Sequence, residues 1–335
     1  MLRLALLLLG VLTLIGLVWH IGPSRILDAA TVLGPASLLV ILLPSLLMYV
    51  LEAFGWRITL GRHASSVAFW RLFVIRTAGE VVNMTTPTAY VGGEPLKAYL
   101  LKRRGVPMVD ALASVVIAKT TMTIAEVLFI LLGIAIAFGV LGASGSSHMP
   151  VLATTLSVGV LLVATAAFVL IQRRGLFTSL LAALRRCRIR IRFLEVREDK
   201  LQALDRTILE FYTRDQRAFF LSTGTFFFGW LAEALEVYAI LYYLGPPADV
   251  LTALAIGALS AFIKGGTFFI PGSLGAQDGG NLLLLVVFGY TELTGITFAL
   301  VRRLRELVWI GIGLLCLVAL GGRERLAQAG DVREN

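Results

Sequence analysis

TAGEVVNMTTPTAYVGGEPLKAY (residues 77–99) and AFIKGGTFFIPGSLGAQDGGN (residues 261–281) are two short apolar stretches that proline and glycine interrupt. They lie at comparable places in the two halves of the chain, and each carries charged residues that a bilayer would exclude. Unwound backbone persists at membrane depth only where protein buries it or where it lines a water-filled cavity. Interrupted hydrophobic segments at corresponding positions are typical of a transporter's binding site. The two stretches therefore predict a protein that moves a substrate rather than one that hydrolyses it.

The composition of the whole chain indicates a membrane protein. The 335 residues are 58% apolar and 15% charged, with a mean hydropathy of +0.86. Several apolar runs reach the ~20 residues that cross a hydrocarbon core about 30 Å thick. We predict an all-α polytopic membrane protein with a single transmembrane domain over residues 1–335. Cys187 lies in a basic loop and Cys316 in an apolar run, so neither is expected to form a disulfide.

The apolar runs divide into about six full spans and two broken or re-entrant helical pairs, which coincide with the interrupted stretches. The first run has a basic start at Arg3 but lacks the small residues of a cleavage site, so we expect a retained helix. The full spans are predicted at residues 2–19, 35–60, 109–140, 150–172, 218–244 and 293–320.

Basic residues predict the orientation of these spans. Positive charge gathers at residues 102–104, within the loop 173–217 and at Arg323 and Arg325, whereas loops 142–149 and 245–249 carry none. By the positive-inside rule, both termini are then cytoplasmic. The loop 173–217 is either the orientation signal alone or an amphipathic helix lying on an anionic leaflet. Its basic residues lack interleaved aromatics, so we expect no nucleic acid partner.

The same orientation gives the two halves opposite topology. Residues 64–104 begin and end on the cytoplasmic side, and residues 250–292 begin and end outside. We therefore predict an inverted-topology repeat, with a first repeat at 1–140 and a second at 149–320 that the basic cytoplasmic loop 173–217 interrupts. Glu52 and Glu233 fall at similar depths of their spans, as do Lys119 and Arg305.

Many charged residues lie in or beside the apolar runs. An ionised side chain at the bilayer centre costs roughly 2.5–3.5 kcal/mol, so these residues must pair, hydrate in a cavity or meet a charged substrate. One interpretation is a structural ion-pair network. The other is an anion-binding site between the two breaks, where helix N-termini and nearby cations favour a phosphate or carboxylate.

Under the second interpretation, the predicted residues fall into two groups. The predicted substrate-binding residues are Glu80, Asn83, Gly92, Gly93, Glu94, Lys97, Lys119, Lys264, Gln277, Asp278, Arg302 and Arg305. The candidate proton carriers are Glu52, Glu233 and Glu236.

These residues resemble a known family. The segment from Pro87 to Lys97, preceded by Gly79-Glu80 and Asn83, is similar to the flippase-like transmembrane family, as are Pro271-Gly-Ser-Leu-Gly275 and a late arginine cluster at 302–305. That family includes the membrane portion of lysylphosphatidylglycerol synthases and hopanoid-associated membrane proteins, and the resemblance runs from about residue 22 to residue 320.

The resemblance implies a phospholipid or polyprenyl-lipid translocase of the bacterial cytoplasmic (inner) membrane. The second motif usually continues to an acidic residue after its last glycine. Here Gln277 and Asp278 follow Ala276, so either Asp278 takes that place or Gln277 replaces the acid with a neutral group. The chain contains no aminoacyl-transferring domain, so synthase activity does not carry over.

Three functions compete on these observations. The first is a membrane lipid translocase that moves an anionic phospholipid or polyprenyl-type lipid between leaflets, and the others are an integral-membrane transferase acting on a lipid headgroup and an ion-coupled small-solute transporter. The sequence has no G-x-x-x-x-G-K-[ST] loop and no H-E-x-x-H motif, so we expect no ATPase, metal or other cofactor. The expected partners are membrane lipids, and a homo-oligomer is compatible with the sequence.

Overall fold

The computed structural model is built from helices. It describes residues 21–86, 92–143, 151–186, 198–245, 249–267, 273 and 275–331, with isolated positions before residue 20. Every α-helix bounded within these ranges follows in chain order: α2 (Pro23–Thr59), α3 (Phe69–Thr85), α4 (Gly93–Lys102), α5 (Met108–Ala143), α6 (Val151–Arg173), α7 (Leu176–Arg186), α9 (Glu198–Arg214), α10 (Gln216–Leu244), α11 (Val250–Gly266), α12 (Ala276–Val287) and α13 (Glu292–Asp331). A 3₁₀ helix, η1 (Gly61–Ser65), follows α2.

The prediction of an all-helical multi-pass membrane protein is confirmed. Within the described residues, three helices are long and apolar enough to cross a membrane, at Leu33–Thr59, Met108–Gly142 and Gln216–Leu244. The predicted span at 35–60 begins where Gly34, with a φ of 72°, kinks α2 ahead of Pro35.

The count of six spans stays a prediction. A fourth candidate is the pair Leu162–Arg173 and Leu176–Arg186, which is bent by 93°. α13 fills the predicted span at 293–320, but a cluster of charged residues at 302–306 interrupts its apolar sequence. Most of the first predicted span, 2–19, lies outside the described residues, as does Pro150 at the start of the fourth.

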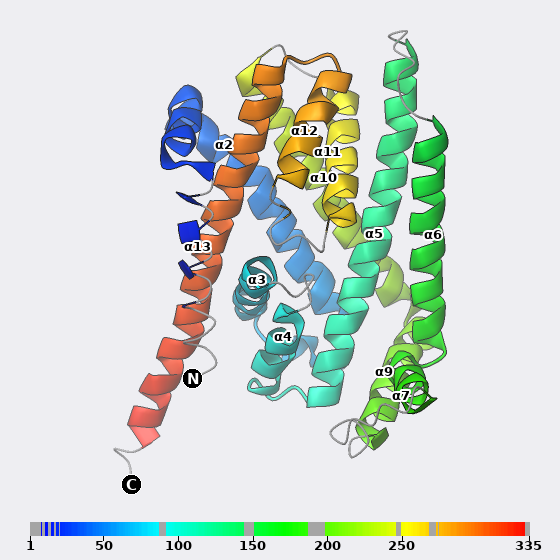
Figure 1. Cartoon of the computed structure of the whole chain (residues 1–335). Helices are drawn as coiled ribbons and strands as arrows, with labels where there is room; N and C mark the ends of the chain where they lie inside the picture. The colour runs from blue at the N-terminus through cyan, green and yellow to red at the C-terminus, as the bar shows by residue number, and fades with distance from the viewer. Residues whose placement is uncertain are drawn as a thin grey trace.

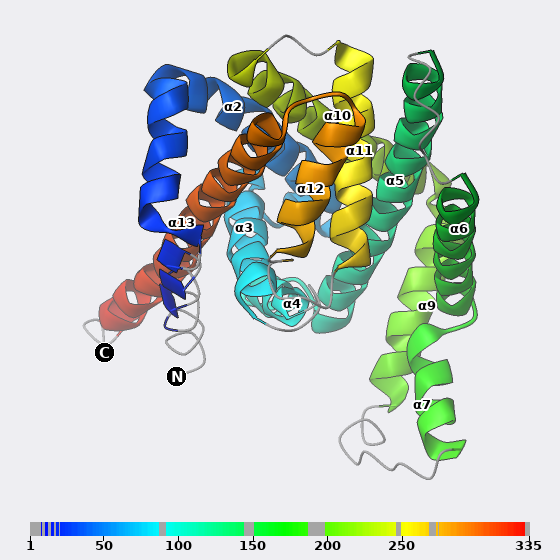
Figure 2. The same ribbon diagram turned by 45° about the horizontal axis from the view of Figure 1, so that its top comes forward.

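The two broken segments occupy opposite halves of the bundle. Figure 1 shows α3 and α4 in its lower half and α11 and α12 in its upper half, and Figure 2 keeps the same order. α2 packs along α10 through the middle. Each broken pair packs against a long helix from the other half of the chain: α3 contacts α13, and α11 contacts α5.

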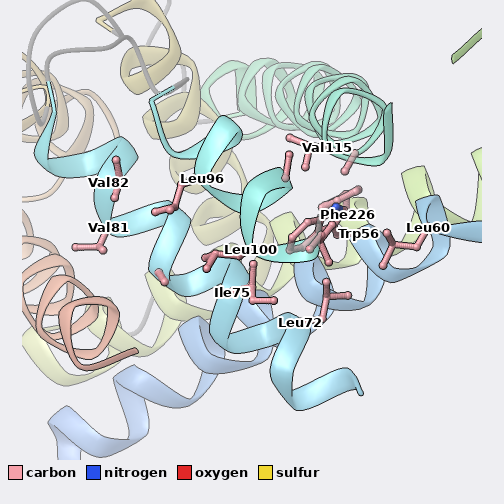
Figure 3. Close-up of a cluster of buried hydrophobic side chains, with 14 of the residues drawn as sticks. Trp56, Leu60, Leu72, Ile75, Val81, Val82, Leu96, Leu100, Val115 and Phe226 are labelled. Atoms are coloured by element: carbon pink, nitrogen blue, oxygen red, sulfur yellow. The ribbon is translucent and has the colours of Figure 1, made fainter. Parts of the chain in front are cut away.

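A large hydrophobic cluster joins the lower half of the bundle. Trp56 of α2, Phe226 of α10 and Val115 of α5 belong to it and lie close together in Figure 3. Leu72 and Ile75 of α3 extend the cluster toward Leu96 and Leu100 of α4 (Figure 3). Close van der Waals packing of these side chains holds α3 and α4 against the long helices.

The basic segments gather at one end of the molecule. The turn after α4, the helices α7 and α9, and the C-terminal end of α13 all lie at the bottom of Figure 1. Asp205 of α9 accepts hydrogen bonds from the backbone N–H groups of Phe177 and Thr178 at the start of α7. α7 ends in Arg185 and Arg186, and Arg185 pairs with Glu198 at 2.7 Å. The segment of the loop 173–217 for which an amphipathic helix was one interpretation thus forms the helix α7, which hydrogen bonds and an ion pair connect to α9.

The opposite end holds the polar start of α11. Asp249 precedes this helix, and its carboxylate accepts a hydrogen bond from the backbone N–H of Thr252 at 2.8 Å. This bond stabilises the charged form and lowers the pKa of Asp249 below its ordinary value. The cap satisfies one of the free N–H groups that begin every helix.

Two glycines allow helices from the two halves of the chain to pack closely against each other. A Cβ atom at Gly133 of α5 would overlap the Cβ of Ala258 on α11. A Cβ atom at Gly313 of α13 would lie 2.7 Å from the Cβ of Val81 and 3.1 Å from the carbonyl oxygen of Thr77, both on α3. In each case the last long helix of one half carries a glycine where the broken pair of the other half packs on it.

We expect Gly133→Ala to destabilise the protein by about 1–3 kcal/mol, because the added methyl group forces α5 and α11 apart. The matched control is Gly139→Ala on the same helix, where a Cβ atom meets nothing within 4 Å. Thermal unfolding in detergent should show a lower midpoint for Gly133→Ala alone. Equal midpoints for both variants would contradict the packing described here.

Candidate functional site

A cavity of about 280 Å³ lies where the inner ends of the two broken segments meet the long helices. Glu80 and Met84 come from the last turns of α3, and Lys264 and Gly265 from the end of α11. The rest of the lining comes from α2, α3, α5, α10 and α13: Met48, Tyr49, Glu52, Arg76, Lys119, Met122, Glu126, Trp230, Glu233, Arg305, Glu306 and Trp309. The cavity is therefore formed by both halves of the chain.

Helical periodicity places these side chains together. Lys119, Met122 and Glu126 follow one another at intervals of three and four residues, so they share one face of α5. Arg76 and Glu80 do the same on α3. This spacing is the signal by which the sequence could have indicated residues that the prediction omitted.

The omitted lining residues are mostly apolar or aromatic. Tyr49 and Trp309 stack with ring centroids 3.7 Å apart and an interplanar angle of 12°. Trp230 and the methionines at 48, 84 and 122 complete an apolar wall beside the charges. Large apolar residues on a helix are ordinary core residues in most sequences, so only the fold distinguishes these.

The first break forms a compact polar network. The side-chain oxygen of Asn83 accepts a hydrogen bond from the N–H of Gly93 at 2.6 Å, and its amide nitrogen donates to Glu94 at 3.0 Å. Lys97 pairs with Glu94 at 2.9 Å and with Glu80 at 3.5 Å. The network satisfies a backbone N–H in the first turn of α4, which has no partner within its own helix.

Glycine is required at Gly93 by close packing. A Cβ atom there would overlap the carbonyl oxygen of Gly79, because the first turn of α4 lies directly on α3. The Gly-Gly-Glu sequence therefore joins the two short helices. Gly92 precedes the first residue of α4.

The second break has a network of its own. The carboxylate of Asp278 accepts a hydrogen bond from the N–H of Gly275 at 3.0 Å and pairs with Arg303 at 2.8 Å. Arg303 also pairs with Glu306 at 2.7 Å, and Glu306 lies 3.8 Å from the amine of Lys264. Carboxylates and cations thus alternate in a chain of ion pairs from Asp278 at the start of α12 to Lys264 at the end of α11.

Three arginines pair with three buried glutamates in the cavity wall and directly beside it. Arg76 pairs with Glu52, Arg302 with Glu233, and Arg305 with Glu236, the last at 3.2 Å. Arg302 also donates to Ser260 at 2.7 Å, and Ser260 donates to Asn281 at 2.7 Å. The pairs of Arg302 and Arg305 join α13 to α10, and the pair of Arg76 joins α3 to α2, as the ion-pair interpretation predicts.

Two charged side chains that line the cavity have no ion-pair partner among the described residues. Among the described residues, Lys119 has no carboxylate and Glu126 no cation within ion-pair distance. Both are half-buried, and both stand on the cavity face of α5. A smaller cavity of about 30 Å³ adjoins Lys119 and is also lined by Glu94 and Lys97.

The predicted site residues divide by position. Glu80, Lys119, Lys264 and Arg305 line the main cavity, together with two of the three proposed proton carriers, Glu52 and Glu233. Outside its lining lie Asn83, Gly92, Gly93, Glu94, Lys97, Glu236, Gln277, Asp278 and Arg302. Gln277 is buried, and its side-chain oxygen has no hydrogen-bond partner in the described part of the chain. Within the described ranges no group of three or more His, Cys, Asp or Glu residues is arranged to hold a metal ion.

Comparisons with known proteins agree with the family resemblance. Residues 1–313 match the family described as "Lysylphosphatidylglycerol synthase TM region". A protein of Methanothermobacter thermautotrophicus described as a "UPF0104 membrane protein" is 26% identical over 298 residues, which cover 85% of this chain and 84% of that protein. No solved structure matches the chain.

The paired and unpaired charges should respond differently to mutation. Arg302→Ala leaves Glu233 buried without its partner, so we expect a loss of about 3–5 kcal/mol in the free energy of unfolding. Lys119→Met removes a cation that has no such partner and should change stability by less than about 1 kcal/mol. Thermal unfolding in detergent measures both effects. A Lys119→Met variant as unstable as Arg302→Ala would mean that Lys119 belongs to the structural network.

Proposed function

The chain belongs to the lysylphosphatidylglycerol synthase TM region family, and from this membership and the cavity we propose that it moves lipid between the leaflets of a membrane. The transported lipid carries an anionic headgroup and is a phospholipid or a polyprenyl-type lipid. The headgroup occupies the cavity, and the hydrocarbon tail remains in the bilayer. The chain is a translocase and not an enzyme, and the end of the molecule with the basic segments, and both termini, face the cytoplasm.

The observation that carries this proposal is the unpaired amine of Lys119 in a cavity between the two breaks. The buried arginines are already neutralised by glutamates, whereas Lys119 has its charge available for a ligand. A phosphate placed there gains a charge-assisted hydrogen bond in surroundings of low dielectric. Tyr49, Trp230 and Trp309 offer the apolar surface that the lipid near its headgroup requires.

The packing of the two halves supports an inverted repeat. If α2, α3, α4 and α5 are exchanged with α10, α11, α12 and α13, each contact between helices has a counterpart. The contact of α3 with α13 corresponds to that of α11 with α5, and the contact of α4 with α5 corresponds to that of α12 with α13. Rocking of two such halves around a central site is the common way in which inverted repeats give alternating access.

The transferase alternative has weaker support. A carboxylate pair for acid and base chemistry would need two differently poised groups, and Glu80 and Glu94 are the candidates. Both contact the side chains of Asn83 and Lys97 instead, in a network that orders the start of α4.

Lys119→Ala should lower the rate of lipid movement by about ten- to one-hundredfold, the loss expected when a charge-assisted hydrogen bond worth about 1.5–3 kcal/mol is removed from the bound headgroup. The assay uses phosphatidylcholine vesicles that contain the protein and a trace of phosphatidylglycerol with an NBD-labelled acyl chain, whose outer-leaflet label dithionite bleaches. The matched control is Lys200→Ala, which removes an exposed amine on α9. Arg305→Ala should also slow movement, but it strips Glu236 of its partner, so Lys119 gives the clearer result.

Three outcomes would count against the proposal. Equal rates for Lys119→Ala and the wild type would remove Lys119 from the site. A labelled lipid of changed mass after incubation would identify a transferase. Uptake of a water-soluble anion without lipid movement would identify a small-solute transporter.

A further inference from the structure

Glu126 is a carboxylate of the cavity lining that forms no ion pair among the described residues. It stands two helical turns beyond Lys119 on α5. A methyl group placed on Gly265 would lie 3.8 Å from one of its carboxylate oxygens, so the side chain reaches across to the end of α11. Its nearest environment is the cavity itself.

Charged and titratable groups face Glu126 from each of the helices that line the cavity. α5 contributes Lys119 and α11 contributes Lys264. The others are Tyr49 and Glu52 from α2, Arg76 and Glu80 from α3, Glu233 from α10, and Arg305 and Glu306 from α13. Apart from Lys119 and Tyr49, each of these groups has a partner of opposite charge within 4.0 Å.

The charges around the cavity can be balanced as a set. The set contains the charged residues that line either cavity and the partners to which ion pairs connect them. Its cations are Arg76, Lys97, Lys119, Lys264, Arg302, Arg303 and Arg305, and its carboxylates are Glu52, Glu80, Glu94, Glu126, Glu233, Glu236, Asp278 and Glu306. Seven cations face eight carboxylates, so protonation of one carboxylate makes the set neutral.

Pairing decides which carboxylate that is. Glu52, Glu233 and Glu236 are each held by an arginine, and protonating any of them would leave that buried arginine uncompensated. Glu306 lies between Arg303 and Lys264, and Asp278 pairs with Arg303. Glu80 and Glu94 share Lys97, and each also accepts a hydrogen bond from the amide of Asn83. Glu126 has no such partner, so its protonation breaks no ion pair.

Binding of an anion strengthens this preference. When a phosphate occupies Lys119, Glu126 becomes the one charge of the set without a counter-charge nearby. An isolated charge in apolar surroundings is costly, and taking up a proton removes the cost. Headgroup and proton then favour each other's binding to the same extent, because coupling between two sites is reciprocal.

We propose that Glu126 is the proton-coupling residue and carries one proton with each anionic headgroup. The proton binds a carboxylate oxygen of Glu126 when the headgroup arrives from one leaflet, and it is released to the opposite side when the headgroup leaves. This inference rests on the proposed lipid translocation and adds its driving force. Lipid should therefore move in the direction in which protons flow.

The test imposes a pH gradient on the vesicles described above, which contain labelled phosphatidylglycerol. With one proton per headgroup, a gradient of one pH unit should shift the leaflet distribution of the label by up to about tenfold toward the alkaline side. In Glu126→Gln the gradient should have no effect, while movement without a gradient persists because the amide resembles the protonated carboxyl group. Glu126→Asp keeps a titratable group and should respond to the gradient.

The matched control is Glu210→Gln, which neutralises an exposed carboxylate on α9 and should behave like the wild type. A wild-type protein that moves lipid but ignores the gradient would overturn the coupling and leave the proposed function intact. A response in Glu126→Gln equal to that of the wild type, or loss of movement in that variant without a gradient, would overturn the role of Glu126. If the wild-type protein moves no lipid under any gradient, the proposed function itself fails.

Discussion

Each charged side chain inside an apolar bundle needs an opposite charge or a hydrated cavity, and this constraint organises the centre of the protein. Arg76, Arg302 and Arg305 meet their glutamates across helix interfaces. Such pairs hold α2 against α3 and α10 against α13 by directional contacts, which matter in lipid because apolar side chains gain little there by leaving one apolar medium for another. The cavity holds the two charged side chains, Lys119 and Glu126, that have no ion-pair partner in the described part of the chain.

The two breaks serve this arrangement by bringing polar backbone into the interior. Asn83 fixes the first turn of α4 against α3, and Asp278 accepts from the backbone N–H at the start of α12. Both breaks are thus stabilised by side chains that the sequence predicted as ligands. Their position behind the cavity wall gives them a structural task, and the lining charges Lys119 and Glu126 remain available to a ligand and a proton.

Much of the fold could be predicted because length and hydropathy constrain a membrane helix strongly. The ranges 35–60, 109–140 and 218–244 coincide with α2 beyond its kink, α5 and α10 to within a few residues. The 93° bend between α6 and α7 was not predicted, although Gly175 lies at the bend with a positive φ of 94°. A single glycine in a chain with 33 of them carries too little information to place a bend.

The sequence by itself determined that this is a helical membrane protein with two interrupted segments, and it indicated the charged residues that the interior must accommodate. Only the tertiary structure decided which charges neutralise each other. Glu52, Glu126 and Glu233 look alike in sequence, each an acid within an apolar run. All three line the cavity, yet Glu52 and Glu233 pair with arginines, whereas Glu126 has no cation within ion-pair distance in the described part of the chain. The reason is physical: an ion pair needs its two groups within about 4 Å, and the packing of distant helices sets that distance.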